Sequence, residues 1–487
     1  MNFMAEKPKS LKWNFFMNAV LTASSLLFPL VSFPYVSRVL GPEGMGKVSF
    51  ASSLVSYFAI FAQLGIPTYG IRVCAALRDR KTELTRTVQE LTLLNLIMSA
   101  AAYGALFALV WAVPKLRAER ELYFIMSLTI LFNAIGMEWL YKALEQYAYI
   151  AARSIFFKVV GLGAVFALVH RPEDVLVYGA VSLIALSGSS VLNLLNTRRF
   201  VGLRPVGDYH LGRHLGPVGV FFAMSCATTL YTQLDTVMLG FLQTDREVGY
   251  YHAAVKIKSI LVSVVTSLGV VLLPRAAYYI QQGRRDQFEQ MAAKGLRFVW
   301  LAAPPLAVYF ILFARESILF LSGGAYAAAV LPMQIILPVL VLVGLTNVMG
   351  LQMLVPLGRE KAVLRSELAG AAVNLAANFL LIPGLSSVGA ALGTLLAETV
   401  VWAIQRRALR DQLASVRLPL ARLAGALGAG CLASIWVKAL ELPPFFALAL
   451  SAGLFFGSYS LVHLAAREPL ALELLALLRR KTRLPGK

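Results

Sequence analysis

The chain has 487 residues, of which 58% are hydrophobic and only 14% charged, and its formal net charge is +20. A soluble domain carries about a quarter charged residues, so this composition excludes an ordinary soluble globular protein. The positive charge does not indicate nucleic-acid binding, because no basic patch interleaved with aromatic residues stands outside the apolar stretches. Cations at the ends of membrane spans, where they also attract anionic lipids, explain the charge instead.

Apolar stretches long enough to cross a bilayer fill the chain almost from end to end. About twenty apolar residues, at 1.5 Å rise per residue, cross a hydrocarbon core of ~30 Å. Helices are expected, because an open sheet in lipid would leave backbone groups without hydrogen bonds. The sequence therefore predicts an all-α integral membrane protein with 14 transmembrane helices, at residues 13–36, 45–69, 87–113, 121–142, 148–169, 174–195, 214–241, 247–275, 294–314, 326–355, 361–383, 386–406, 418–440 and 444–466.

Basic residues alternate between the loops on the two sides of these spans. The termini and the even-numbered loops hold 32 of the 45 Lys and Arg residues, the odd-numbered loops hold 9, and 4 lie deeper inside spans. Since cytoplasmic loops collect Lys and Arg, we expect both termini on the cytoplasmic side. No loop is long enough to form a soluble domain.

The first twelve spans have the pattern of an internal repeat of six. Gly41, Gly46, Gly65 and Arg72 align with Gly240, Gly249, Gly269 and Arg275, at offsets between 199 and 204 residues. Because six is an even number, the two units share one orientation, which is a parallel repeat about an axis along the membrane normal. We expect two six-helix bundles around a central cavity, followed by two extra helices. The expected domains are residues 1–206, 207–411 and 412–487.

Polar residues recur at spacings of three and four in several spans, which places them on one helix face. One interpretation is a hydrated cavity into which these faces point. The other is helix–helix contact, since small polar residues hydrogen-bond between packed membrane helices. The cavity interpretation gives these lining residues: Asn14, Asn18, Ser56, Gln63, Thr232 and Ser259.

Ionisable residues inside spans are costly unless they face a partner or water. Asp235 and Lys256 lie at comparable depth in neighbouring spans, where they form either a structural ion pair or a site whose lysine binds an anionic substrate. Glu367 and Glu398 are expected near the cytoplasmic mouth of the second bundle. Two close carboxylates raise one another's proton affinity, so the three acids are candidates for coupling to H⁺ or Na⁺. Snorkelling of the two glutamates to the headgroups explains them equally well.

The sequence has no constellation typical of an enzyme or a metal site. Its 3 cysteines and 5 histidines are scattered, without the spacing of disulfides or metal ligands. We therefore expect no catalytic residue, no metal and no cofactor.

Three short segments resemble a known family. Residues 33–46 read FPYVSRVLGPEGMG, residues 64–72 read LGIPTYGIR, and residues 234–240 in the seventh span read LDTVMLG. In these segments the chain resembles the polysaccharide repeat-unit flippases, which are O-antigen (Wzx-type) translocases of lipid-linked oligosaccharides. That family belongs to the multidrug/oligosaccharidyl-lipid/polysaccharide exporter superfamily.

The resemblance implies alternating access of the central cavity and a substrate of sugar units on a polyprenyl diphosphate. Transport would run from the cytoplasmic to the outer leaflet of a bacterial cytoplasmic membrane, for polysaccharide biosynthesis. The implied partners are membrane lipids, H⁺ or Na⁺, and polysaccharide polymerase or glycosyltransferase enzymes. In relatives, spans 13 and 14 can form a groove for a lipid tail. Cavity cations would hold the phosphate-bearing headgroup; the candidates are Arg38, Arg72, Arg153, Lys158, Lys256 and Lys258.

Two other functions stay open at the level of sequence. A multidrug or organic-cation extruder of the same fold would favour acids and aromatic residues over lysines, whereas the basic residues inside these spans favour an anionic ligand. A non-transporting scaffold of a polysaccharide synthesis complex would not need ionisable residues along its spans.

Overall fold

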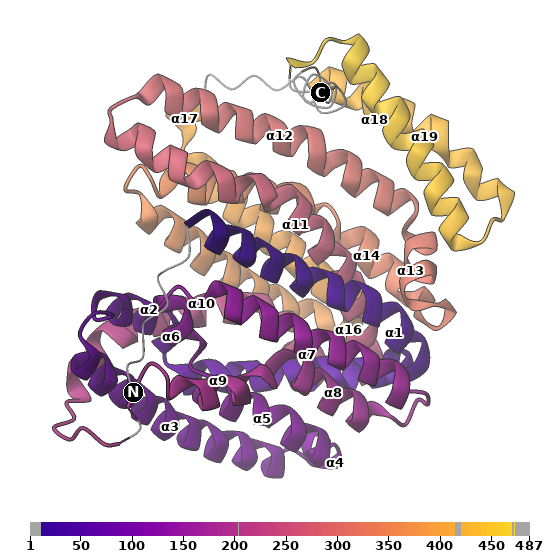
Figure 1. The fold of residues 1–487 in the computed structure, drawn as a ribbon. Helices are drawn as coiled ribbons and strands as arrows, with labels where there is room; N and C mark the ends of the chain where they lie inside the picture. The colour runs from indigo at the N-terminus through magenta and orange to yellow at the C-terminus, as the bar shows by residue number, and fades with distance from the viewer. Residues whose placement is uncertain (1–10, 203, 414–419, 470–471, 473–487) are drawn as a thin grey trace, which may run out of the picture. The chain divides into compact units, whose positions relative to one another are not determined.

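The structure is a computed structural model that describes residues 11–202, 204–413, 420–469 and 472 (Figure 1). The chain divides into two compact units, Met1–Gly249 and Tyr250–Lys487. Every regular element that the described residues form is a helix, so the all-helical prediction is confirmed. The domain limits at residues 206 and 411 stay a prediction.

In the first unit the described residues form ten helices and the start of an eleventh. They are α1 (Leu11–Gln63), α2 (Ile66–Ala76), α3 (Lys81–Ala112), α4 (Pro114–Ala118), α5 (Arg120–Gly136), α6 (Glu138–Ala143), α7 (Tyr147–Leu168), α8 (Val175–Ser187), α9 (Ser189–Thr197), α10 (Gly212–Leu242) and the beginning of α11 (Asp245–Gln281).

The second unit takes the rest of α11 and the remaining described helices. They are α12 (Arg285–Leu312), α13 (Ala314–Ser322), η1 (Gly324–Ala329), α14 (Val330–Ile336), α15 (Val339–Asn347), η2 (Val348–Leu354), α16 (Glu360–Ala408), α17 (Arg410–Leu413), α18 (Leu420–Ser434), η3 (Ile435–Leu440) and α19 (Pro444–Ala465).

Two helices are too long to cross a bilayer once. α1 is broken between the predicted spans 13–36 and 45–69, and α16 at the first residue of the predicted span 386–406. α1 has 53 residues and α16 has 49, or about 80 and 74 Å at 1.5 Å per residue. Non-helical backbone interrupts α1 at Gly41 (φ 66°) and α16 at Ser386 (φ 50°). Pro42 then starts the next helical segment, where its missing N–H leaves no helical bond unmade. Each long helix therefore has room for two crossings.

The chain is a multi-pass membrane protein. Among the described residues, 10 helices are long and apolar enough to cross a membrane, or 11 if the bent pair Gly324–Ile336 and Val339–Leu354 is one span. Two of these 10 are the broken segments Phe16–Ala76 and Glu360–Ala408. The count of fourteen crossings stays a prediction. Residues 1–10 and 473–487, on which the position of the termini depends, lie outside the described residues.

The odd-numbered loops of the first unit meet at one end, which we name the Gly41 end. There Lys47 Nζ lies 2.6 Å from Glu119 Oε1, and Gly44 packs against the segment just before α8. In that segment the backbone N–H groups of His170 and Arg171 donate to Asp174 and hold the pKa of its carboxyl below the usual value.

The even-numbered loops of the first unit meet at the other end, which we name the Glu90 end. Arg78 Nη1 lies 3.6 Å from Glu145 Oε1, and Gln89 Nε2 donates to the Gly202 carbonyl oxygen at 2.8 Å. The 32 residues of α3, about 48 Å long, separate the two ends. The loops thus segregate as the alternation of basic residues predicts.

The first part of α1 and α7 run side by side in the same direction. Asn14 Nδ2 donates to Glu145 Oε2 at 3.4 Å near the start of both, and Tyr35 OH donates to the Val169 carbonyl oxygen at 2.8 Å near the end of both. A shared direction is expected of two odd-numbered spans.

In the second unit α18 and α19, yellow in Figure 1, pack on α12. Tyr309 OH of α12 donates to the Leu448 carbonyl oxygen at 2.8 Å, and Tyr459 OH of α19 donates to the Leu301 carbonyl oxygen at 2.9 Å. The two helices that the sequence places outside the repeat are therefore fastened to α12 by buried tyrosines.

Candidate functional site

A polar cavity of about 280 Å³ lies among the membrane helices of the first unit. Its wall comes from α5, α10 and the part of α1 beyond Gly41. The hydroxyl-bearing residues on the wall are Ser52, Ser56, Thr129, Thr229 and Thr232, and the amide-bearing residues are Gln63, Asn133 and Gln233. None of the lining residues that the structure describes is charged.

Helical spacing explains why each helix turns these side chains to the same side. Ser52 and Ser56 are four residues apart on α1, Thr129 and Asn133 are four apart on α5, and Thr229 and Gln233 are four apart on α10. Residues at this spacing share one helix face. Each of the three helices therefore turns polar side chains to the cavity, while Val55, Ala59, Ile60 and Met126 add apolar groups to the same wall.

One hydrogen bond ties α1 to α10 beside the cavity. Ser53 Oγ donates to Gln233 Oε1 at 2.9 Å. Because the amide oxygen is held, the NH₂ group of Gln233 is oriented as a donor. The cavity wall is thus partly fixed by the protein's own bonds.

Three of the predicted lining residues, Ser56, Gln63 and Thr232, line this cavity. The sequence interpretation did not include Thr129 and Asn133, although their spacing of four was a signal of the same kind. Asn14 and Asn18 are not among the lining residues. Asn14 is buried and bonds to Glu145, and Asn18 is exposed. The functional role of all these residues stays a prediction.

Two glycines bring the backbone of α1 against the start of α11 at the Gly41 end. A Cβ atom on Gly46 would overlap the Asp245 carbonyl group, and a Cβ atom on Gly249 would overlap the Pro42 carbonyl group. Pro42 and Asp245 are 203 residues apart, as are Gly46 and Gly249. The contact is therefore reciprocal: each glycine meets the carbonyl group that is equivalent to the one the other glycine meets, as in a contact about a two-fold axis. We name these four residues the glycine clasp; it agrees with the predicted parallel repeat.

Lys115 closes the Gly41 end beside the clasp. Its Nζ donates to the carbonyl oxygens of Gly240 at 2.6 Å and Gln243 at 2.7 Å, and lies 3.4 Å from Asp245 Oδ1. The last carbonyls of a helix lack partners within it and are stabilised by a cation. The space left between these groups is about 10 Å³, which is about one water molecule. The first unit is therefore closely packed at this end.

A buried carboxylate anchors the start of α10 at the Glu90 end. Glu90 is fully buried and accepts from Arg213 Nη2, from the His210 backbone N–H at 2.8 Å, and from His214 Nε2 at 2.9 Å. Tyr69 OH lies 3.0 Å from His214 Nδ1. All these bonds are made when the proton of a neutral His214 sits on Nε2 and Tyr69 donates to Nδ1. The network ties α10 to α2 and α3.

Arg38 and Arg72, two of the candidate headgroup cations, lie at opposite ends of the first unit. Arg38 is exposed near the Gly41 end, where its Nη1 donates to the Pro34 carbonyl oxygen at 2.6 Å. Arg72 is exposed on α2, with its guanidinium 5.9 Å from the centre of the Phe221 ring. Residues 42–63 of α1, about 33 Å of helix, stand between them. The structure does not bring these two cations together.

Arg153 and Lys158 are both buried on α7 but differ in their partners. Arg153 Nη2 lies 3.0 Å from Glu138 Oε2. Lys158 Nζ donates to the hydroxyl oxygens of Ser24 and Ser25 of α1, at 3.0 and 2.7 Å. Hydroxyl groups carry no net charge, so these two bonds supply no counter-charge, and the lysine interacts with Glu138 only electrostatically.

The remaining predicted residues lie on α10, α11 and α16. Asp235 is buried on α10; Lys256 and Lys258 are half-buried and Ser259 is exposed on α11. Glu367 and Glu398 both lie on α16, close enough to interact electrostatically. Their roles in binding and ion coupling stay predictions. No group of three or more His, Cys, Asp and Glu side chains in the described part of the chain could hold a metal ion.

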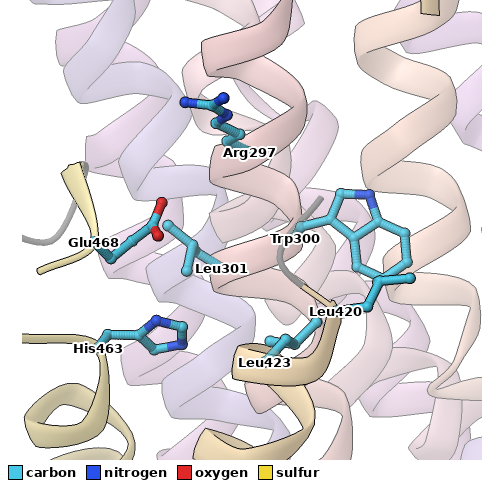
Figure 2. Close-up of a pocket in the computed structure, with 7 residues that line it drawn as sticks. All are labelled: Arg297, Trp300, Leu301, Leu420, Leu423, His463 and Glu468. Carbon is cyan, nitrogen blue, oxygen red and sulfur yellow. The ribbon is translucent and has the colours of Figure 1, made fainter. Parts of the chain in front are cut away.

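A second pocket, in the second unit, is too small for a substrate. Figure 2 shows Arg297, Glu468 and His463 beside Trp300 and Leu301, where α19 approaches α12. Its volume is about 10 Å³, which is about one water molecule. The polar cavity of the first unit is therefore the better candidate for a binding site.

Comparison with known protein families gives two matches along the chain. Residues 11–279 match the family described as polysaccharide biosynthesis protein, and residues 221–380 match the family described as MatE. A protein assigned as an O-antigen transporter in Escherichia coli (strain K12) is 23% identical over 404 residues, which cover 82% of this chain and 97% of that protein. A protein with the same assignment in Shigella dysenteriae is 21% identical over 412 residues, covering 82% and 100%.

Two solved structures have a similar fold. The lipid II flippase MurJ, in an inward closed conformation, superposes with a TM-score of 0.70 at 11% identity, over 93% of this chain and 100% of that chain. An inward-facing multidrug resistance transporter of the MATE family, in the MOP superfamily, superposes with a TM-score of 0.60 at 14% identity, over 83% and 100%. The predicted superfamily fold is confirmed.

Proposed function

Because the chain belongs to the polysaccharide biosynthesis protein family, we propose that it is a flippase, which moves a lipid-linked oligosaccharide across the membrane by alternating access. The observation that carries the proposal is the polar cavity within apolar membrane helices. Sugar hydroxyl groups lose their hydrogen bonds to water on entering a membrane, and buried polar groups are costly without partners. A hydroxyl- and amide-lined cavity supplies those partners, while a prenyl tail can stay in lipid.

The direction of transport follows from charge. We place the chain in a bacterial cytoplasmic membrane with both termini in the cytoplasm, because the even-numbered loops are the basic ones. The Gly41 end then faces outward, and the glycine clasp with Lys115 is the outer seal. The cytoplasm is electrically negative, so each negative charge of a diphosphate gains about 2.3 kcal/mol per 100 mV on moving outward.

Lys158 is the strongest headgroup candidate in the first unit. A buried cation stabilised by hydroxyl groups, as here by Ser24 and Ser25, gains from a phosphate oxygen that brings opposite charge. Arg153 already has Glu138 as a partner, which favours a structural role. Lys256 and Lys258 are the corresponding candidates on α11.

Energy coupling and protein partners complete the proposal. Asp235, Glu367 and Glu398 are the candidate carriers of H⁺ or Na⁺, because a coupling ion has to bind the two access states unequally. The polymerase and glycosyltransferases that make and use the lipid-linked sugars at the membrane are the expected protein partners.

Genetic replacement tests the function. In a bacterial host without its O-antigen flippase, expression of this chain together with its own sugar-assembly genes should restore surface polysaccharide. A host that gains resistance to organic cations but no surface polysaccharide would support an extruder instead. Restoration that does not depend on the residues of the cavity or on Lys158 would support a scaffold.

A further inference from the structure

We infer that the cavity of the first unit is a subsite for an uncharged sugar and that it excludes phosphate and acidic sugars. The inference rests on the proposed function and adds a division of labour to it. The sugar would bind between α1, α5 and α10, while the diphosphate would bind elsewhere.

The first argument is the chemistry of the wall. Each amide offers an acceptor oxygen and two N–H donors, and each hydroxyl group both donates and accepts. Gln63, Asn133 and Gln233 supply the amides, and Thr129 and Thr232 are among the hydroxyl groups. Ser56 and Thr232 donate to carbonyl oxygens of their own helices, which leaves their oxygens as acceptors for sugar hydroxyl groups. The N–H groups of the amides serve as donors to the sugar.

The second argument is the charge around the cavity. No lining residue in the described structure is cationic, so a phosphate or a carboxylate would enter without a counter-charge. Asp235 follows Gln233 by two residues, is 7% exposed, and interacts electrostatically with Tyr57, the neighbour of Ser56. This neighbouring side chain is an acid, so it brings no cation to the wall.

The third argument is the place of the basic residues. Arg153 pairs with Glu138, Arg72 lies against Phe221, and Lys158 binds serine hydroxyls of the first part of α1. All three side chains are outside the cavity wall. An anionic headgroup that uses them cannot occupy the same space as the sugar.

The size of the cavity sets how much sugar it takes. A volume of about 280 Å³ lies at the lower end of the ~300–1,000 Å³ of small-molecule sites. This is room for a small part of a repeat unit rather than the whole. The subsite would therefore select one sugar by its lack of charge and leave the rest of the unit outside.

Cysteine protection tests the subsite in the full-length chain in lipid nanodiscs. Cys74, Cys226 and Cys431 are replaced by Ala, Ser56 is replaced by Cys, and the rate of labelling by a small polar thiol reagent is measured. The probes are N-acetylglucosamine, methyl glucoside, glucuronate and inorganic pyrophosphate, at equal concentration and matched ionic strength. At twice the dissociation constant, a neutral sugar should slow labelling about threefold. Glucuronate and pyrophosphate should not slow it.

Two variants control this measurement. Thr68→Cys, exposed on α2 and outside the cavity wall, should label at the same rate with every probe. Asn133→Leu, which keeps the size of the side chain but removes the amide, should abolish protection of Ser56→Cys. Protection that survives this change would place the sugar elsewhere.

Three results would overturn the inference. The first is equal protection of Ser56→Cys by pyrophosphate or glucuronate. The second is normal labelling that no sugar slows, which would mean that the cavity holds only water. The third is failure of Ser56→Cys to label at all. Transport of a lipid-linked oligosaccharide by the unaltered chain is measured separately. Transport without sugar protection removes the subsite and leaves the flippase, whereas protection without transport removes the flippase.

Discussion

Gly46 and Gly249 lie against each other, so that a Cβ atom on Gly46 would stand 3.0 Å from the Gly249 backbone nitrogen. They hold equivalent places in the two predicted repeats, 203 residues apart. Gly46 also lies against the carbonyl group of Asp245, and Gly249 lies against the carbonyl group of Pro42. A reciprocal contact of this kind makes a close backbone seal that any side chain would wedge apart.

Gly46→Ala should therefore favour opening of the Gly41 end. Inserting a methyl group into a close contact costs about 1–3 kcal/mol, and this cost falls only on the sealed state. Labelling of Ser56→Cys by a membrane-impermeant thiol reagent added outside intact cells should increase. Gly104→Ala is the control, because nothing lies within 4 Å of its Cβ position. Equal labelling in the two variants would show that the clasp is not a seal.

Lys115→Met should lower stability, because the carbonyl oxygens of Gly240 and Gln243 lose their donor and Asp245 loses its partner. A hydrogen bond to a charged group contributes about 1.5–3 kcal/mol, reduced here because the lysine side chain is 34% exposed. Thermal unfolding in detergent should show a loss of about 1–2 kcal/mol. Arg117→Met, which removes bonds to the Trp111 carbonyl only, should cost less. The opposite order would refute the role given to Lys115.

Glu90→Gln should be strongly destabilising. The change leaves Arg213 without a counter-charge and removes an acceptor from His214, in a position that is fully buried. The Arg213 side chain is 47% exposed, so water screens the charge that is left. Losing the hydrogen bonds of the buried carboxylate costs about 1–3 kcal/mol. Glu83→Gln is the matched control on the same helix, since Glu83 is exposed and pairs with Arg80 at the surface. Similar unfolding temperatures for the two variants would contradict the anchor.

Lys158→Gln should abolish polysaccharide export while the protein stays at its normal level in the membrane. Lys158→Arg should be milder, since the charge survives although the donor geometry changes. Lys256→Gln should behave like Lys158→Gln if both cations hold the headgroup. Surface polysaccharide and membrane protein level are measured together in each strain. Full export by Lys158→Gln would return this lysine to a purely structural role.

The fold followed from the sequence because apolar length and the alternation of basic residues are independent of tertiary detail. Apolar length placed a loop around Gly41, where α1 is broken. The alternation of basic residues predicted that the loops near Lys47 and near Arg78 lie at opposite ends of the first unit. Neither pattern revealed the break at Met137 (φ 41°) within the predicted span 121–142, or the π-helical turn η2 within 326–355. Short breaks of this kind change neither hydropathy nor charge.

The candidate site was only partly predictable. Polar spacing identified Ser56, Gln63 and Thr232, but the same spacing suggested Asn14, which instead bonds to Glu145. A polar stripe shows that a helix face needs polar neighbours; packing decides whether these are water or another side chain. The Glu90 network joins Glu90 to His214, which is more than a hundred positions away, so no local sequence pattern predicts it.

The most direct test of a flippase is a leaflet-specific assay in proteoliposomes. The purified chain is reconstituted with a fluorescent polyprenyl-diphosphate-linked sugar, and a membrane-impermeant quencher measures the fraction in the outer leaflet over time. We expect the chain to speed exchange between leaflets strongly over protein-free vesicles, and Lys158→Gln to remove that increase. Exchange no faster than in protein-free vesicles, under a membrane potential and with H⁺ and Na⁺ gradients imposed, would contradict the account.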